Sequence, residues 1–69
     1  SKGDERSLTK REKEVLQLSA NGMQTKSMAK KLFVSPKTIE THKVNIYRKL
    51  HVSNITDAVA TGLRNKWID

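Results

Sequence analysis

Residues 25–50 read TKSMAKKLFVSPKTIETHKVNIYRKL, and this stretch decides the fold. Its first part carries Met28, Ala29 and Leu32 at the three- and four-residue steps that return to one face of a helix. The spacing therefore predicts a short helix over 26–32 with that face buried.

The middle of the stretch contains Ser35 followed by Pro36. A serine ahead of the first turn caps a helix, and proline suits the first helical position because its missing amide hydrogen has no partner there. A second helix is expected over 36–50, since no glycine or further proline interrupts it. Two helices joined by such a tight turn predict a helix-turn-helix over about 25–44.

Positive charge is concentrated in the same stretch. It holds +6 of the whole chain's +7, because seven basic residues there face a single acid, Glu40. A basic cluster on a helix-turn-helix is typical of a domain that binds nucleic acid. The basic residues are Lys26, Lys30, Lys31, Lys37, Lys43, Arg48 and Lys49.

Two further helices flank the stretch. Thr9 and Glu12 have the spacing of a capping box, in which each side chain accepts from the other's backbone amide, so a helix is expected over 10–20 with Gly22 ending it. A last helix is expected over 54–65. With no strand signal, the prediction is an all-α four-helix bundle.

Length and composition allow one domain, which we expect to span 8–69. The chain has 69 residues and no cysteine, so neither a disulfide framework nor a thiolate zinc site is expected. Residues 1–7 are polar and are interpreted as a linker or an expression remnant. No apolar run is long enough for a membrane span, and the expected location is cytoplasmic. A regulatory domain is expected upstream, outside this chain.

The helix over 36–50 has two distinct sides. A turn of 100° per residue places Ile39, Ile46 and Leu50 on one side, which is expected to pack in the core. The opposite side is expected to meet the edges of base pairs in the major groove, where valine suits a thymine methyl and an acid suits a cytosine amine. The expected base-reading residues are Lys37, Glu40, Thr41 and Val44.

Other polar residues are expected to contact phosphates, which orient a protein on DNA without reading sequence. These are Lys26, Thr38, Lys43, Asn45 and Arg48. An ordinary solvated face remains the alternative for Lys37, Glu40 and Arg48, and a single scattered surface apolar residue for Val44. Lys30 and Lys31 could also neutralise phosphates, with solubility alone as the alternative.

Catalytic and metal-binding patterns are missing from the sequence. His42 and His51 are the only histidines, and no acid cluster completes a metal shell around them. His42 is interpreted as structural and Tyr47 as a core residue. No nucleophile motif or glycine-rich phosphate loop is present, so we predict that the chain is not an enzyme and uses no cofactor or metal.

These residues resemble the LuxR/NarL/GerE-type DNA-binding domain of bacterial transcription regulators, over nearly the whole chain. The resemblance implies that helix 36–50 enters the major groove, with Glu40, Thr41 and Val44 at base-contacting positions. It also implies an upstream receiver or ligand-binding domain, as in a two-component response regulator. The resemblance rests on residues 8–16, Gly22, Lys26, Ala29, Leu32, residues 34–39, His42, Asn45, Ile46, Lys49, Leu50, residues 52–54 and Ala58.

The resemblance further implies homodimers on paired half-sites, through the helix over 54–65. The residues expected at this contact are Ile55, Val59 and Gly62. Gly62 stands where the family commonly has alanine, and it is expected either to weaken the helix or to let a partner's backbone approach.

Three other positions depart from the family pattern. Ser27 and Met28 replace glutamate and a β-branched residue, so looser packing is expected around helix 26–32. Lys66 stands where the family has glycine, so Asn65, which tolerates a positive φ, is expected to end the last helix instead. Trp67 and Ile68 are then expected to fold back over the core.

Two alternative functions remain open from the sequence. Region four of a sigma factor contains a similar helix-turn-helix and acts with RNA polymerase, although the fourth helix argues against it. A basic protein-interaction module with an acidic partner is the second. RNA polymerase is a possible partner for the main prediction as well.

Overall fold

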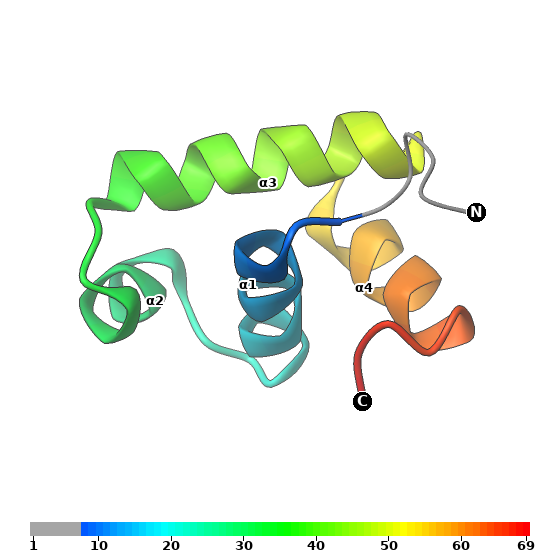
Figure 1. Cartoon of the computed structure of the whole chain (residues 1–69), viewed down its shortest axis with the longest axis horizontal. Helices are drawn as coiled ribbons and strands as arrows, with labels where there is room; N and C mark the ends of the chain where they lie inside the picture. Colours follow the sequence, from blue (N-terminus) through cyan, green and yellow to red (C-terminus); the bar gives the residue numbers. More distant parts are fainter. Residues whose placement is uncertain (1–7) are drawn as a thin grey trace.

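The structure is a computed structural model that describes residues 8–69, and these residues form four helices. Helix α3 lies across the other three, with α2 beneath its first turns, α1 beneath its middle and α4 near its end (Figure 1). Residues 1–7, which were expected to be a linker or an expression remnant, lie outside the described residues. The helices are α1 (Lys10–Ala20), α2 (Thr25–Leu32), α3 (Pro36–Leu50) and α4 (Ile55–Arg64). The predicted all-α architecture is therefore confirmed, with helix ends within one residue of those expected.

Local caps fix where α1 begins and ends. The Thr9 amide donates to Glu12 Oε1 at 2.9 Å and the Glu12 amide donates to Thr9 Oγ1 at 3.1 Å, which is the predicted capping box. At the other end Gly22 has φ +88°, and the next amide, that of Met23, donates to the Leu18 carbonyl at 3.0 Å. This reversal needs the positive φ that glycine adopts without strain.

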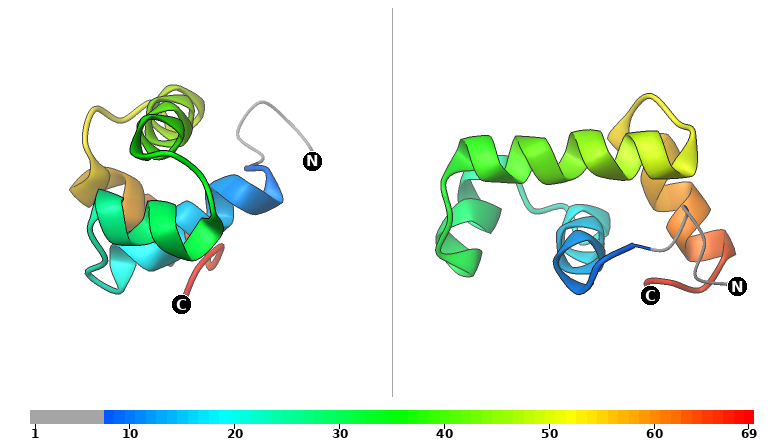
Figure 2. Two further views of the ribbon diagram at one scale, coloured as in Figure 1. Left: turned by 90° about the vertical axis from the view of Figure 1, so that its left-hand side faces the viewer. Right: turned by 45° about the horizontal axis from the view of Figure 1, so that its top comes forward.

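The turn between α2 and α3 contains one conformation that the sequence did not predict. Phe33 has φ +59°, in the left-handed region, and its side chain is 94% exposed. Ser35 then caps α3 by accepting from the Thr38 amide at 3.1 Å, with Pro36 at the first helical position as predicted. The two views of Figure 2 show the resulting sharp reversal between the two helices.

The core is a single apolar cluster beneath α3. Leu16, Met28, Ile39 and Ile46 are fully buried within it. Met28 is buried with the Ser19 hydroxyl 3.7 Å from its sulfur, and Ser27 is exposed. The looser packing expected around α2 stays a prediction. The remaining buried apolar residues are Leu8, Val15, Ala29, Leu50, Ala58 and Ile68.

The C-terminal segment covers the core in the predicted way. Asn65 is the C-cap of α4 and thus ends the helix as expected, and its side chain donates to the Thr61 carbonyl. The positive φ falls on the next residue, Lys66, at +61°, whereas Asn65 has φ −91°. Ile68 is buried and Trp67 is half-buried, so the chain does fold back over the core.

Gly62 belongs to this core and does not leave a gap for a partner. A Cβ atom at Gly62 would lie 2.9 Å from Leu16 Cδ2 and 3.2 Å from two side-chain atoms of Ile68. The glycine therefore allows α4 to approach α1 and the C-terminal segment closely. This burial corrects the expectation that Gly62 lies at a dimer contact.

A buried ion pair joins α1 to the end of α3. Lys49 Nζ lies 2.7 Å from Glu12 Oε1, and the Glu12 side chain is 5% exposed. Burial alone would raise the pKa of Glu12, but hydrogen bonds from Lys49 and Thr9 and the charge of Lys49 outweigh it, so this pKa lies below its ordinary value of 4.5. Lys49 is thus part of the fold.

Candidate nucleic-acid interface

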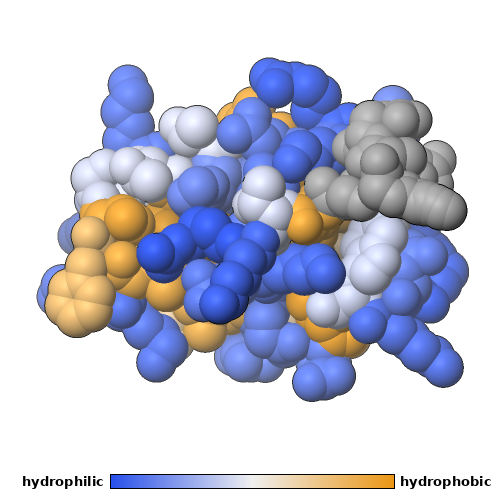
Figure 3. All heavy atoms as spheres, viewed as in Figure 1, coloured by the Kyte–Doolittle hydropathy of each residue, from blue (hydrophilic) through white to orange (hydrophobic). Residues whose placement is uncertain are grey.

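The exposed side of α3 carries the residues that were expected to read bases. Lys37, Glu40, Thr41 and Val44 are all exposed, and the opposite side of the helix is buried. Val44 lies on this exposed side and is 49% exposed. In the space-filling view, hydrophilic side chains predominate along the edge where α3 runs (Figure 3). The geometry that the helical periodicity predicted is therefore present.

Exposed lysines continue from α3 onto α2. Lys26, Lys30 and Lys31 are exposed, and Lys26 and Lys30 line a hollow of about 340 Å³ where α2 meets the start of α3. Ala29, Val34 and Pro36 form the rest of its lining. This surface combines positive charge with a concave shape, which suits the phosphate backbone of a nucleic acid.

Lys43 is placed differently from the other lysines of the predicted set. Its side chain is only 15% exposed, and its Nζ donates to Thr25 Oγ1 at 2.8 Å and lies 3.7 Å from Glu40 Oε2. The ammonium is thus engaged within the protein. Sequence reasoning counted it among free cations, because a contact between residues 18 positions apart leaves no local signal.

Thr25 is a residue that the sequence did not single out for function. It begins α2, and its hydroxyl donates to Glu40 Oε2 at 3.0 Å. Because Glu40 lies on the exposed side of α3, Thr25 connects the start of α2 to the predicted base-reading surface. Its only sequence signal was its position at the first turn of the helix.

The remaining predicted phosphate contacts have protein partners of their own. Thr38 is half-buried, and its hydroxyl lies 3.0 Å from that of Ser35. Asn45 is also half-buried and accepts a hydrogen bond from Arg48 Nη1 at 3.2 Å, while Arg48 itself is exposed. The pair therefore presents a guanidinium whose orientation is set by a neighbouring turn of α3.

The two residues that were interpreted as structural lie at the edge of the core. His42 and Tyr47 are half-buried, and Tyr47 packs against the apolar cluster. Burial first, and then the negative charge of Glu40, raise the pKa of the Tyr47 hydroxyl above its ordinary value of 10.0.

Within residues 8–69, no group of three His, Cys, Asp or Glu side chains is placed to hold a metal ion.

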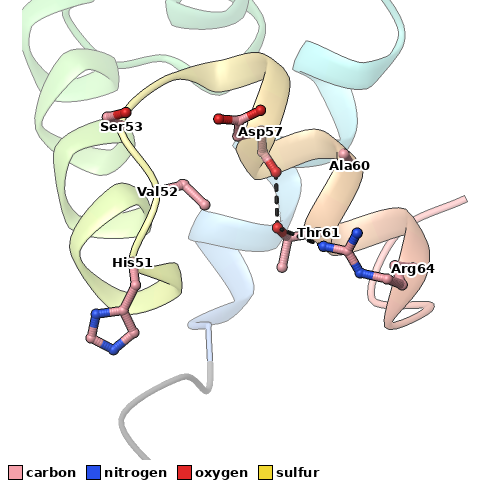
Figure 4. A pocket seen from close by; sticks show the side chains of 7 residues that line it. All are labelled: His51, Val52, Ser53, Asp57, Ala60, Thr61 and Arg64. Carbon is pink, nitrogen blue, oxygen red and sulfur yellow. Dashed lines mark hydrogen bonds between the residues drawn. The ribbon is translucent and has the colours of Figure 1, made fainter.

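A second hollow, of about 480 Å³, lies between the end of α3 and α4. Its residues come from the loop after α3 and from α4, where the Thr61 hydroxyl donates to the Asp57 carbonyl at 2.9 Å and Arg64 Nη2 donates to Thr61 Oγ1 at 3.4 Å (Figure 4). None of the predicted base-reading residues lines it. The hollow is lined by His51, Val52, Ser53, Asp57, Ala60, Thr61 and Arg64.

The dimer residues expected on α4 are only partly accessible. Ile55 and Val59 are half-buried and pack against the core. The large apolar residue that α4 exposes is Leu63, which is 46% exposed and follows Ile55 and Val59 at four-residue steps. In the described part of the chain, no helix is both long and apolar enough to cross a bilayer.

Comparison with known proteins agrees with this geometry. Residues 6–62 match the family described as bacterial regulatory proteins, luxR family. The chain is 45% identical over 64 residues to the oxygen regulatory protein NreC of Staphylococcus carnosus (strain TM300), covering 93% of this chain and 30% of that protein. It is 44% identical over 63 residues to the transcriptional regulatory protein LiaR of Bacillus subtilis (strain 168), covering 91% and 30%.

A solved structure shares the fold as well as the sequence. The response regulator ChrA, from a heme-sensing two-component system, matches with a TM-score of 0.86 and 40% identity, over 90% of this chain and 31% of that one. The chain thus spans about a third of the length of these relatives. The match favours the predicted family over the sigma-factor alternative, and a DNA-binding family agrees with the prediction of no enzymatic activity. The chain belongs to the LuxR family of bacterial regulatory proteins and is a helix-turn-helix DNA-binding domain of that family.

Proposed function

We propose that this domain binds specific sequences of double-stranded DNA by placing α3 in the major groove, and thereby regulates transcription. The observation that carries this proposal is the exposed side of α3, which bears Thr41 and Val44 between charged residues while the other side is buried. The Val44 side chain is 49% exposed, and an exposed valine suits the methyl group of thymine.

The base-reading residues in this proposal are Lys37, Glu40, Thr41 and Val44. Lys37 would meet guanine acceptors or a phosphate, Glu40 the amino group of cytosine, and Thr41 either kind of base edge. The DNA itself would be held by the exposed cations. If each of five neutralises one phosphate, the logarithm of the association constant should fall with the logarithm of salt concentration with a slope of about −4.5. The five are Lys26, Lys30, Lys31, Lys37 and Arg48.

The supporting role of the other polar residues follows from their contacts. Thr38 and Asn45 are proposed to bind phosphates at the edges of the groove, where half-buried side chains can still reach a backbone oxygen. Lys43 is proposed to approach a phosphate while it remains bonded to Thr25. An ammonium has three hydrogens, so these two roles are compatible.

Two copies of the domain are proposed to bind paired half-sites through α4. The surface that a second copy would meet is the stripe of Ile55, Val59 and Leu63, of which only Leu63 is substantially exposed. This apolar stripe is small, so we expect dimers to form mainly on DNA, where two half-sites hold both copies close together.

The whole protein is proposed to be a cytoplasmic two-component response regulator with this domain as its output. Three relatives support the proposal by their descriptions: ChrA is a response regulator of a two-component system, and NreC and LiaR are regulatory proteins. In this scheme a signal received elsewhere in the protein would raise the population of dimers or expose α3. Contact with RNA polymerase would follow once DNA is bound.

Selection of bound duplexes from a random pool tests the proposal. The wild-type chain should enrich one motif, and Val44→Glu should abolish that enrichment while the thermal unfolding midpoint stays within a few degrees of wild type. Lys13→Gln, at an exposed position on α1, changes the net charge by the same amount away from α3 and α4 and is the matched control. If Val44→Glu kept wild-type affinity for the motif, α3 would not be the reading helix. A basic module for an acidic protein partner would enrich no motif at all.

A further inference from the structure

Three polar side chains from two helices meet beside the exposed side of α3. Thr25 comes from the first turn of α2, and Glu40 and Lys43 come from successive turns of α3. Lys43 Nζ lies 2.8 Å from Thr25 Oγ1, and Thr25 Oγ1 lies 3.0 Å from Glu40 Oε2. Lys43 Nζ is 3.7 Å from the same carboxylate oxygen, beyond hydrogen-bond distance but within an ion pair.

The direction of this chain of hydrogen bonds follows from the number of protons available. An ammonium can only donate and an ionised carboxylate can only accept. The Thr25 hydroxyl has one proton, and because Lys43 donates to its oxygen, that proton is free to go to Glu40. The order is therefore Lys43 to Thr25 to Glu40, and each member supports the next.

These hydrogen bonds occupy one oxygen of the Glu40 carboxylate and leave the other free to accept. Oε2 accepts from Thr25, whereas Oε1 accepts no hydrogen bond from any residue in the described range 8–69. The Glu40 side chain is 60% exposed. It therefore presents an acceptor to solvent, and the hydrogen bond from Thr25 on α2 orients it.

We propose that Thr25 is a positioning residue for sequence reading, which holds Glu40 so that its open oxygen accepts from the amino group of a cytosine in the major groove. This inference rests on the proposed function of α3. Guanine offers the acceptors N7 and O6 and thymine offers O4, so both repel a carboxylate. Adenine offers an amino donor but also the acceptor N7 beside it, whereas the cytosine edge offers an amino donor alone. Glu40 is thereby a selector for cytosine at one position of the binding site.

The position of Lys43 accounts for an acidic residue on a DNA-binding surface. A carboxylate close to phosphates is repelled unless a cation offsets its charge. Lys43 provides that charge 3.7 Å away, and its side chain is 15% exposed, which reduces screening by salt. The group of three can thus approach DNA without a net negative charge.

The test compares Thr25→Val, which removes the hydroxyl at nearly the same shape, with Thr25→Ser, which retains it. After pool selection with the wild-type chain, affinities are measured for pairs of duplexes that differ only at the cytosine position identified by loss of preference in Glu40→Ala. Thr25→Val should lower the discrimination between the two duplexes by about tenfold, within the range that one good base contact provides. Thr25→Ser should keep it, and so should Thr56→Val, a threonine on the exposed side of α4.

Two readouts separate positioning from a purely structural role. In the Glu40→Ala background, Thr25→Val should cause no further loss of discrimination, and the salt slope should be unchanged in every variant because the exposed cations remain.

An equal loss of affinity for all duplexes with unchanged discrimination would overturn the inference. So would a Glu40→Ala variant with wild-type preference at every position. The first result leaves the proposed function intact, and the second removes Glu40 from its base-reading residues but leaves α3 as the reading helix. A wild-type chain that enriches no motif would overturn both the inference and the proposed function. If Thr25→Val does not fold, Thr25→Ala replaces it under the same criteria.

Discussion

Removal of Lys49 should destabilise the domain strongly, because it breaks the ion pair that joins α3 to α1. Glu12 would remain in the core with its side chain 5% exposed and without the ammonium that now lies 2.7 Å away. Loss of one partner of a buried pair costs about 3 to 5 kcal/mol. The Lys49 side chain is 29% exposed, so water already weakens the pair, and we expect about 2 kcal/mol for Lys49→Met.

Thermal and urea unfolding followed by circular dichroism measure this change. For a domain of this size a loss of about 2 kcal/mol corresponds to a fall of roughly 8 to 16 °C in unfolding midpoint. Lys13→Met is the matched control, since it removes one exposed lysine from α1 and keeps helix propensity nearly equal. An equal effect of the two substitutions at neutral pH would refute the assignment of a structural role to Lys49.

The same pair predicts how the difference depends on pH. The pKa of Glu12 is lowered in the folded chain, so its contribution to stability is fully present above the ordinary value of 4.5. That contribution is lost as pH falls through the lowered pKa, where the carboxylate becomes protonated. The gap in unfolding free energy between wild type and Lys49→Met should therefore be constant from neutral pH to about pH 5 and shrink below it. A gap that is independent of pH would contradict this reasoning.

Three further predictions use single positions. Gly62→Ala should destabilise by about 1 to 3 kcal/mol despite the better helix propensity of alanine, because its Cβ would lie 2.9 Å from Leu16 Cδ2; urea unfolding measures it, and a stabilised variant would contradict it. Phe33→Gly should stabilise by about 0.5 to 1 kcal/mol, since glycine adopts φ +59° without strain; a lower unfolding midpoint would contradict this. Lys26→Gln should make the salt slope of DNA binding shallower by about 0.9 at every sequence tested; an unchanged slope would exclude a phosphate contact.

The features that sequence predicted well are those with local causes. The Thr9 and Glu12 capping box and the Ser35 cap each depend on residues within three positions of one another, and their hydrogen bonds are present as expected. The two sides of α3 follow from its period alone, so the buried Ile46 and the exposed Val44 were both identified in advance. The conformation at these positions is set by neighbouring residues, so contacts with the rest of the chain alter it little.

The features that sequence missed depend on which residues meet across the fold. A glycine inside a helix can indicate that another backbone or side chain approaches closely. The sequence does not show whether that group belongs to a partner or to the same chain. In the structure Gly62 faces the core of its own chain. Left-handed positions at Phe33 and Lys66 arise because the chain must reverse there, and tertiary packing outweighs the weak preference of those side chains for other conformations. The contact of Thr25 with Glu40 joins residues 15 positions apart.

The division of the lysines has a further consequence for the behaviour of the domain in salt. Lys43 and Lys49 hold α3 to α2 and α1 through contacts that are partly buried, and salt screens such pairs weakly. The exposed cations, by contrast, act on DNA through counterion release, which depends steeply on salt. Rising salt should thus release DNA well before it loosens the orientation of α3. The same class of side chain therefore sets both the position of the reading helix and the attraction to DNA, and burial determines which of the two each lysine serves.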